Sequence, residues 1–358
     1  MPGEKDNMLV PESGRKAGQT LDDEEAERLL RKVRPFVNSV IRIQSMWRGH
    51  LVRVRTAKML EMPGGSHMIN EIEELDTMPE IQNPVTKQLE EKLGPFSFSQ
   101  APNGLTPNRK ARNPVAFDNN TIYIGEWANG LREGRGKQVW QDGSVYEGWW
   151  KNGMANGGGR LIHADGDVYE GQWENDKAQG MGVYTHGDGA RYEGEWESDK
   201  QHGKGMEIWP DGAQYKGDYV MGKKHGKGEF KWADGSVYNG DFDNNNIHGE
   251  GTYKWSDGRE YKGQWKENRM HYKGVFKWLD GRVYVGEYVN DKKEGYGEFK
   301  WAGGRSYRGY WREGKQHGLG IYTRDGVDRK GEWSNGTRIR WINEDEAEKM
   351  NFNLPTLQ

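Results

Sequence analysis

The sequence of 358 residues contains no cysteine, which excludes disulfides, thiol nucleophiles and cysteine-ligated metal sites. It also has no apolar run of the length of a membrane span, and its first ten residues lack the apolar core of a secretory signal. Basic residues do not outnumber acidic ones, with 52 Lys and Arg against 55 Asp and Glu, which argues against bulk nucleic-acid binding. We therefore expect a soluble protein of the cytoplasm.

Hydrophobic residues are scarce at 33%, so a large aliphatic core is not expected. The chain nevertheless has 52 glycines, 16 tryptophans and 17 tyrosines. A disordered chain would be poor in aromatic residues. The combination predicts a fold whose core consists of aromatic rings that lie over glycines.

A tyrosine recurs every 23 residues along most of the chain. These tyrosines are Tyr123, Tyr146, Tyr169, Tyr192, Tyr215, Tyr238, Tyr261, Tyr284 and Tyr307. Each is followed two positions later by glycine and four positions later by an aromatic residue, as in Tyr215, Gly217 and Tyr219. The repeat continues with Gly-x-Gly, as at 226–228, and closes with Asp-Gly, as at 211–212.

This spacing predicts β-hairpins. Positions i, i+2 and i+4 share one face of a strand, and Asp-Gly supplies the positive φ of a tight turn. The fold class is therefore mainly β, an elongated single-layer antiparallel sheet of nine tandem 23-residue hairpins, or about eighteen strands and roughly 85 Å. Exposed strand edges at the two ends leave homo- or hetero-association open.

The repeat resembles the MORN family (membrane occupation and recognition nexus), whose units read Tyr-x-Gly-x-Trp, then Gly-x-Gly-x-Tyr, then Asp-Gly. The resemblance covers about 123–333. One unit departs from the pattern, because Tyr272 stands where the first glycine of Gly-x-Gly is expected. A local bulge, a binding feature and simple drift each explain this departure.

An IQ motif precedes the repeats. Residues 1–19 are predicted to be disordered, and 20–61 to form a helical segment that carries the pattern IQxxxRGxxxR. Its residues implied in calmodulin binding are Ile43, Gln44, Trp47, Arg48, Gly49, Leu51 and Arg53. The helix is basic and amphipathic, which suits an acidic EF-hand lobe. The alternative is that its apolar stripe packs onto the aromatic sheet and caps an edge.

The remaining boundaries follow from composition. Residues 62–116 are predicted to form a linker with short helices near Ile69–Leu75 and Val85–Leu93. The MORN-repeat solenoid spans 117–340, and 341–358 form a C-terminal tail with a short capping helix.

No constellation predicts catalysis, a metal or a cofactor. Histidines recur at one repeat position, but equivalent positions in adjacent repeats lie ~10 Å apart, too far for one zinc ion to bridge. We expect them to be turn residues. They are His202, His225, His248, His271 and His317. None of the Gly-x-Gly elements opens a helix as a phosphate-binding loop does. The segments outside the repeats leave no room for a typical catalytic domain, so the protein is not expected to be an enzyme.

A stripe of tryptophans runs along the later repeats: Trp209, Trp232, Trp255, Trp278 and Trp301. It is either the core of the fold or a partner-binding aromatic face. Charge is also uneven, since residues 123–214 carry 9 Lys and Arg against 16 Asp and Glu, whereas 215–329 carry 22 against 17. Opposite ends of such a rod could meet different partners.

The resemblance implies a non-catalytic structural scaffold that recruits calmodulin or a related EF-hand protein. Similar MORN-rich proteins build the radial-spoke heads of cilia and flagella, so we expect axonemal or other cytoskeletal partners and a place in the axoneme. The alternative is a peripheral membrane adaptor that binds phosphoinositides and is regulated by calmodulin. In that case the basic half would face the lipid, and binding would weaken steeply with salt.

Overall fold

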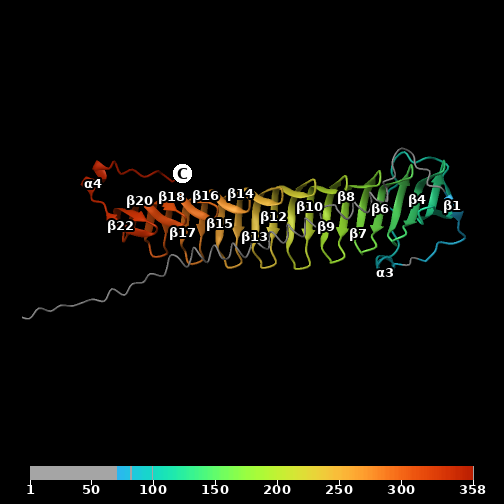
Figure 1. Cartoon of the computed structure of the whole chain (residues 1–358), viewed down its shortest axis with the longest axis horizontal. Coiled ribbons are helices and arrows are strands. Elements are labelled where there is room, and N and C mark those ends of the chain that lie inside the picture. The colour runs from blue at the N-terminus through green and yellow to red at the C-terminus, as the bar shows by residue number, and fades with distance from the viewer. Residues whose placement is uncertain (1–70, 81–82, 99, 358) are drawn as a thin grey trace, which may run out of the picture.

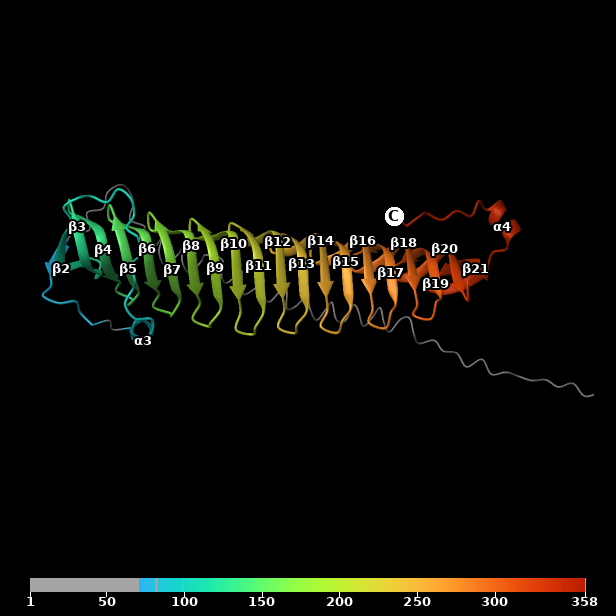
Figure 2. The same ribbon diagram turned by 180° about the vertical axis from the view of Figure 1, so that it is seen from behind.

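A computed structural model describes residues 71–80, 83–98 and 100–357. They form one open antiparallel sheet of 22 strands, drawn out into a rod (Figure 1; Figure 2). The first strands are β1 (Glu71–Glu74), β2 (Lys110–Phe117), β3 (Ile122–Ala128), β4 (Leu131–Val139), β5 (Val145–Lys151), β6 (Met154–Ile162), β7 (Val168–Glu174), β8 (Lys177–Thr185), β9 (Arg191–Glu197), β10 (Lys200–Ile208) and β11 (Gln214–Val220). The others are β12 (Lys223–Lys231), β13 (Val237–Asp243), β14 (Asn246–Lys254), β15 (Glu260–Lys266), β16 (Arg269–Lys277), β17 (Val283–Val289), β18 (Lys292–Lys300), β19 (Ser306–Arg312), β20 (Lys315–Arg324), β21 (Val327–Ser334) and β22 (Thr337–Trp341). The helices are α3 (Pro84–Leu93) and α4 (Glu344–Lys349).

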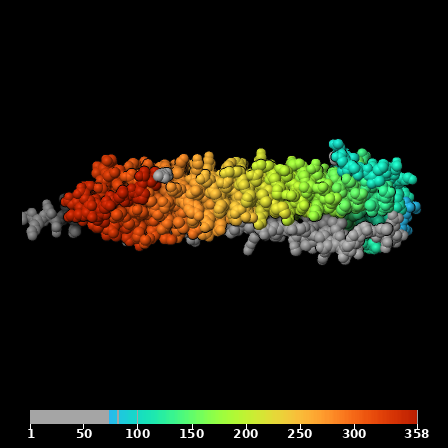
Figure 3. Space-filling view, turned by 90° about the horizontal axis from the view of Figure 1, so that it is seen from above, coloured from blue at the N-terminus to red at the C-terminus, as the bar shows by residue number. Residues whose placement is uncertain are grey.

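Every strand pairs with its neighbours in sequence. The hairpins of the nine repeats are β3 to β20, which confirms the predicted fold class of a mainly β, single-layer antiparallel sheet. The space-filling view shows the same elongated body from above (Figure 3). No helix in the described ranges is long and apolar enough to cross a membrane.

Four further strands extend the sheet beyond the repeats. The described part of the segment near 69–75, where a short helix is expected, is instead β1, which pairs with β2 through Glu71 opposite Phe117 and Glu74 opposite Val115. The expectation of a helix there is wrong because the free edge of β2 offers backbone hydrogen bonds to an extended neighbour. At the other end, β21 and β22 follow the last full repeat.

The helix α3 is fixed onto the turns of the first repeats. Asn83 caps it by accepting hydrogen bonds from the backbone N–H groups of Val85 and Thr86. The Asn83 side-chain amide donates to the carbonyls of Asp142 at 3.2 Å and Ala164 at 3.1 Å. One residue therefore starts the helix and joins it to two successive hairpin turns.

The repeat tyrosines make the inner face of the sheet, which we define as the face that they occupy. Tyr215 is fully buried, and its hydroxyl donates to the carbonyl of Asp218 at 3.0 Å. Its ring lies over Gly217 and Gly228, where an added Cβ would stand 2.4 and 2.5 Å from the tyrosine oxygen. Only glycine fits beneath the ring, which is why tyrosine and the two glycines recur together.

Aromatic contacts link each repeat to the next. The ring of Tyr215 packs edge to face against Tyr219 of its own strand, with centroids 5.3 Å apart, and against Phe242 of the following repeat at 5.1 Å. This geometry is favourable for aromatic pairs. Because the same contacts recur along the rod, a continuous aromatic core forms without a second sheet.

Candidate functional site

The carboxylates and amides of the outer face, which is the opposite side of the sheet, have a structural role. At the first glycine of each Gly-x-Gly the backbone has a positive φ, 58° at Gly226 for example, and the ladder shifts by a bulge. The backbone N–H of Lys227 that follows donates to Asp218 Oδ2 at 3.0 Å. The N–H of Glu250 likewise donates to Asp241 Oδ2 at 2.9 Å.

The ionisation of Asp241 fits this role. Partial burial raises the pKa of this carboxyl, but hydrogen bonds from the Lys227 side chain and the Glu250 backbone outweigh it, so that the pKa lies below its ordinary value. The group remains a carboxylate that only accepts hydrogen bonds. A general acid would need the opposite shift, so Asp241 caps its bulge and does not indicate an acid–base site.

Two of the recurring histidines accept hydrogen bonds that tie one hairpin to the next. His202 Nδ1 accepts from the backbone N–H of Met221 at 3.5 Å, and His271 Nδ1 accepts from Asn290 at 3.3 Å. All five recurring histidines lie in strands, namely β10, β12, β14, β16 and β20, so the expectation that they are turn residues is wrong. The N–H groups that donate to His202 and His271 do belong to turn residues. Among the described residues, no group of three or more potential ligands could hold a metal ion.

The tryptophan stripe contributes to the buried core. Trp209, Trp232 and Trp255 expose 5%, 5% and 8% of their surface, whereas Trp278 and Trp301 are partly buried against the same cluster. For Trp209, Trp232 and Trp255, this burial favours the interpretation that the stripe is part of the core of the fold. A partner on this stripe stays a prediction, and it would reach mainly Trp278 and Trp301.

A buried ion pair interrupts the aromatic core, and the sequence analysis did not find it. Lys224 Nζ donates to Glu207 Oε2 at 2.7 Å, and both side chains are 2% exposed. The hydroxyl of Tyr219 donates to the same carboxylate oxygen at 2.9 Å. Glu207 takes the place that Phe230 has one repeat later, so a comparison of the repeats position by position would have revealed it.

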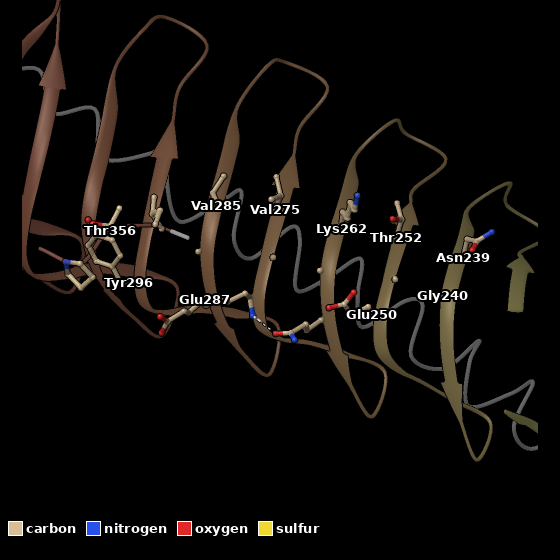
Figure 4. A pocket seen from close by; sticks show the side chains of 18 of the residues that line it. Asn239, Gly240, Glu250, Thr252, Lys262, Val275, Val285, Glu287, Tyr296 and Thr356 are labelled. Carbon is tan, nitrogen blue, oxygen red and sulfur yellow. Dashed lines mark hydrogen bonds between the residues drawn. The ribbon is translucent and has the colours of Figure 1, made fainter. Parts of the chain in front are cut away.

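A groove of about 830 Å³ lies on the outer face across β12 to β18. Figure 4 shows side chains of successive strands, including Thr252, Lys262, Val275 and Val285, along one side of it. Backbone glycines lie between the two rows of side chains. One end is closed by residues 355–357 of the C-terminal tail, which turns back along the sheet after α4 (Figure 1).

The segment after α3 covers the outer face at the other end of the rod. Phe98 packs edge to face on Trp149 with centroids 5.7 Å apart, and Phe96 packs on Phe98 at 5.1 Å. Arg160 donates to the carbonyl of Gly94 at 2.8 Å. The two terminal segments of the described chain thus cover opposite ends of the same face, and the middle repeats remain uncovered by them.

The predicted calmodulin-binding residues lie outside the described residues, as do the predicted disorder of 1–19 and the helical segment 20–61. The residues concerned are Ile43, Gln44, Trp47, Arg48, Gly49, Leu51 and Arg53. Their roles stay predictions from the sequence.

Family models match both parts of the chain. The model described as "MORN repeat" matches nine units: 123–145, 146–168, 169–191, 192–214, 215–237, 238–258, 261–281, 284–304 and 307–326. The model described as "IQ calmodulin-binding motif" matches residues 37–56. The comparison with curated proteins found no match.

Some solved structures share a limited likeness with this chain. The TCP10 domain of CPAP from Danio rerio is 14% identical and covers 55% of this chain and 92% of its own, with a TM-score of 0.32. The G-box domain of the microcephaly protein CPAP is also 14% identical, covers 63% of this chain and 100% of its own, and has a TM-score of 0.27. Scores this low carry no argument about function.

Proposed function

Since this chain belongs to the MORN repeat family, we propose that it is a non-catalytic scaffold that recruits calmodulin or a related EF-hand protein to a cytoskeletal assembly. One observation carries the proposal, namely that a complete IQ motif at 37–56 is joined to a rod of nine repeats. The motif supplies a recognition segment for an EF-hand lobe, and the rod supplies an extended surface that spaces and orients partners.

The chemistry of the sheet supports a structural role. Asp218 and Asp241 are engaged in capping bulges, and His202 and His271 in joining hairpins. Glu207 is held by the buried ion pair with Lys224. These groups are committed to the fold, which is what a scaffold requires and what a reacting centre does not.

We place the scaffold in the axoneme of cilia or flagella, in a position similar to a radial spoke. This part of the proposal is supported by the resemblance of the repeat array to ciliary MORN proteins alone. The competing assignment is a phosphoinositide-binding adaptor, for which exposed lysines that are not paired with carboxylates of the sheet would be needed. Lys227 instead forms an ion pair with Asp241 at 2.5 Å, and Lys204 pairs with Asp218, so that part of the positive charge is neutralised within the sheet.

A binding measurement tests the recruitment. The full chain and a Trp47→Glu variant are titrated with calmodulin by isothermal calorimetry, with and without calcium. Because a carboxylate in the apolar stripe would have to be buried in an EF-hand lobe, we expect affinity to fall at least 100-fold. Ser45→Ala is the matched control in the same motif and should bind as the parent does. Equal affinity of the parent and the Trp47→Glu chain would overturn the assignment.

A further inference from the structure

The outer groove has a floor of backbone glycines, a pair of valines in one wall, and charges of both signs. Val275 of β16 and Val285 of β17 are directly paired in the ladder and lie side by side on this face (Figure 4). Charged residues of both signs line the same groove, namely Lys227, Lys262, Lys273, Glu250 and Glu287. Lys227 is paired with Asp241, so the remaining charges largely cancel. A ligand with a strong net charge of either sign would gain little electrostatic attraction in this groove. An uncharged ligand would not have to desolvate lysines or glutamates that lack an opposite charge nearby.

The tail shows what kind of chain lies in this groove. Residues 351–357 have no regular secondary structure, and Pro355, Thr356 and Leu357 line the groove at its end. Tyr296, which also lines it, is only 5% exposed although it lies on the outer face. An uncharged segment with proline and leucine therefore already occupies one end, and the groove continues beyond it.

Tyr272 departs from the repeat in a way that drift does not explain. It has a φ of 54°, in the left-handed region that the other repeats fill with glycine at this position. A bulky residue is unfavourable there. Gly226 and Gly249 hold the equivalent position in two other repeats. An added Cβ there would touch Asp218 and Asp241, which lie on the outer face. The side chain of Tyr272 therefore leaves the backbone on the outer face.

The strained tyrosine is also prominently exposed. Tyr272 exposes 54% of its surface, and the next residue, Lys273, lines the groove. The ring of Tyr272 packs edge to face on His271 with centroids 4.4 Å apart, but this contact lies outside the aromatic core. A strained backbone that presents a large aromatic ring to solvent lowers stability and gains no core packing in return. A contact with a partner explains why glycine is absent here, since tyrosine supplies large contact area at low entropic cost and packs well on proline and leucine.

We propose that this groove, together with Tyr272 next to its lining residue Lys273, is a docking site for an extended, uncharged segment of a partner protein that contains proline and leucine as the tail does. The stretch from β13 to β17 that the described tail leaves uncovered spans four strand spacings of ~4.8 Å, or room for about six residues in an extended conformation. The backbone groups of these strands are used in the ladders. Proline suits such a site because it brings no backbone N–H that would lose a partner.

The experiment uses the full chain and a fluorescent peptide that copies residues 351–358, NFNLPTLQ. A matched peptide carries glutamate in place of both leucines. Fluorescence anisotropy should show saturable binding of the first peptide and at least tenfold weaker binding of the second. Tyr272→Gly restores the repeat glycine, so we expect it to raise the Tm while it weakens peptide binding at least fivefold. Replacement of a residue with a purely structural role would not raise the Tm and weaken peptide binding at the same time.

Two further variants complete the test. Met181→Thr changes an outer-face side chain that is also 54% exposed but lies outside the groove, and it should leave binding unchanged. Val285→Lys places a charge in the apolar part of the groove wall and should weaken binding at least tenfold. Equal binding of both peptides, or unchanged binding by Tyr272→Gly, would overturn the proposal. So would a dimer in sedimentation that dissociates when residues 352–358 are removed, because the groove would then belong to a second copy of this chain. Calmodulin is absent throughout, so the outcome is independent of the proposed recruitment.

Discussion

The buried pair of Glu207 and Lys224 is the most direct test of how the aromatic core tolerates charge. Lys224 Nζ lies 2.7 Å from Glu207 Oε2, and it also lies 4.7 to 5.4 Å from the ring centroids of Trp209, Tyr215 and Tyr219. Burial lowers the pKa of Lys224, against the opposing effect of Glu207. The lysine therefore depends on this one carboxylate to remain charged in an apolar site.

The change is Glu207→Phe, which installs the residue that Phe230 provides in the next repeat. It leaves Lys224 buried without its carboxylate, and removal of one partner from a buried ion pair costs about 3–5 kcal/mol. The double variant Glu207→Phe with Lys224→Ile also copies Ile247, the equivalent of Lys224 one repeat later. Replacement of both charges by apolar residues is expected to be neutral or to stabilise the fold by about 1–4 kcal/mol.

Chemical denaturation followed by tryptophan fluorescence measures both effects. Because each repeat contacts only its neighbours, the single variant should separate the unfolding into two transitions, with the first located near β10 to β12. The double variant should restore one transition at or above the parent midpoint. The reasoning is refuted if the single variant loses less than about 1 kcal/mol, or if the double variant is as unstable as the single one.

Three other predictions concern the repeat itself. Gly228→Ala places a Cβ 2.5 Å from the oxygen of Tyr215 and should lower the free energy of unfolding in denaturant by about 2–3 kcal/mol. Gly303→Ala, with open space around it, should change that free energy by less than about 0.5 kcal/mol. Similar losses of stability in the two variants would contradict the role of the ring. Asp241→Ala should speed hydrogen exchange at the Glu250 amide, and Asp241→Asn, which keeps an acceptor, should not. Burial raises the pKa of repeat tyrosines such as Tyr192 above the ordinary 10.0, so their stabilising effect is complete below about pH 10 and is lost as the pH rises above it. Tyrosine absorbance and circular dichroism should then change together. Ionisation of these buried tyrosines near pH 10 with an intact sheet would contradict this.

The fold was predictable because its determinants recur at a fixed period. Tyr215, Gly217 and Tyr219 already imply strand faces, and the recurrence of this pattern identifies the core without an alignment. The structure adds the physical reason, which is the close approach of the ring of Tyr215 to Gly228 of the neighbouring strand. Nothing in one repeat reveals that contact, because it depends on the register between two strands.

The parts that sequence reasoning missed depend on contacts between distant segments. The strand β1 forms because β2 offers it an edge, and the tail lies in the groove because the sheet places β16 to β18 beside it. Tyr272 was visible as a departure from the pattern, but only its φ of 54° distinguishes a costly choice from drift. The IQ motif, in contrast, is recognised from the sequence alone, and its residues lie outside the described ranges.

The most direct test of the scaffold assignment is a fractionation of motile cilia. The cilia are extracted with non-ionic detergent, the axonemes are washed with salt, and both fractions are probed for this protein and for calmodulin. The assignment predicts that the two proteins remain together on the axonemes and that calmodulin is lost from this complex when the chain carries Trp47→Glu. Release of the protein with the membrane fraction would contradict it and would favour the lipid-binding adaptor.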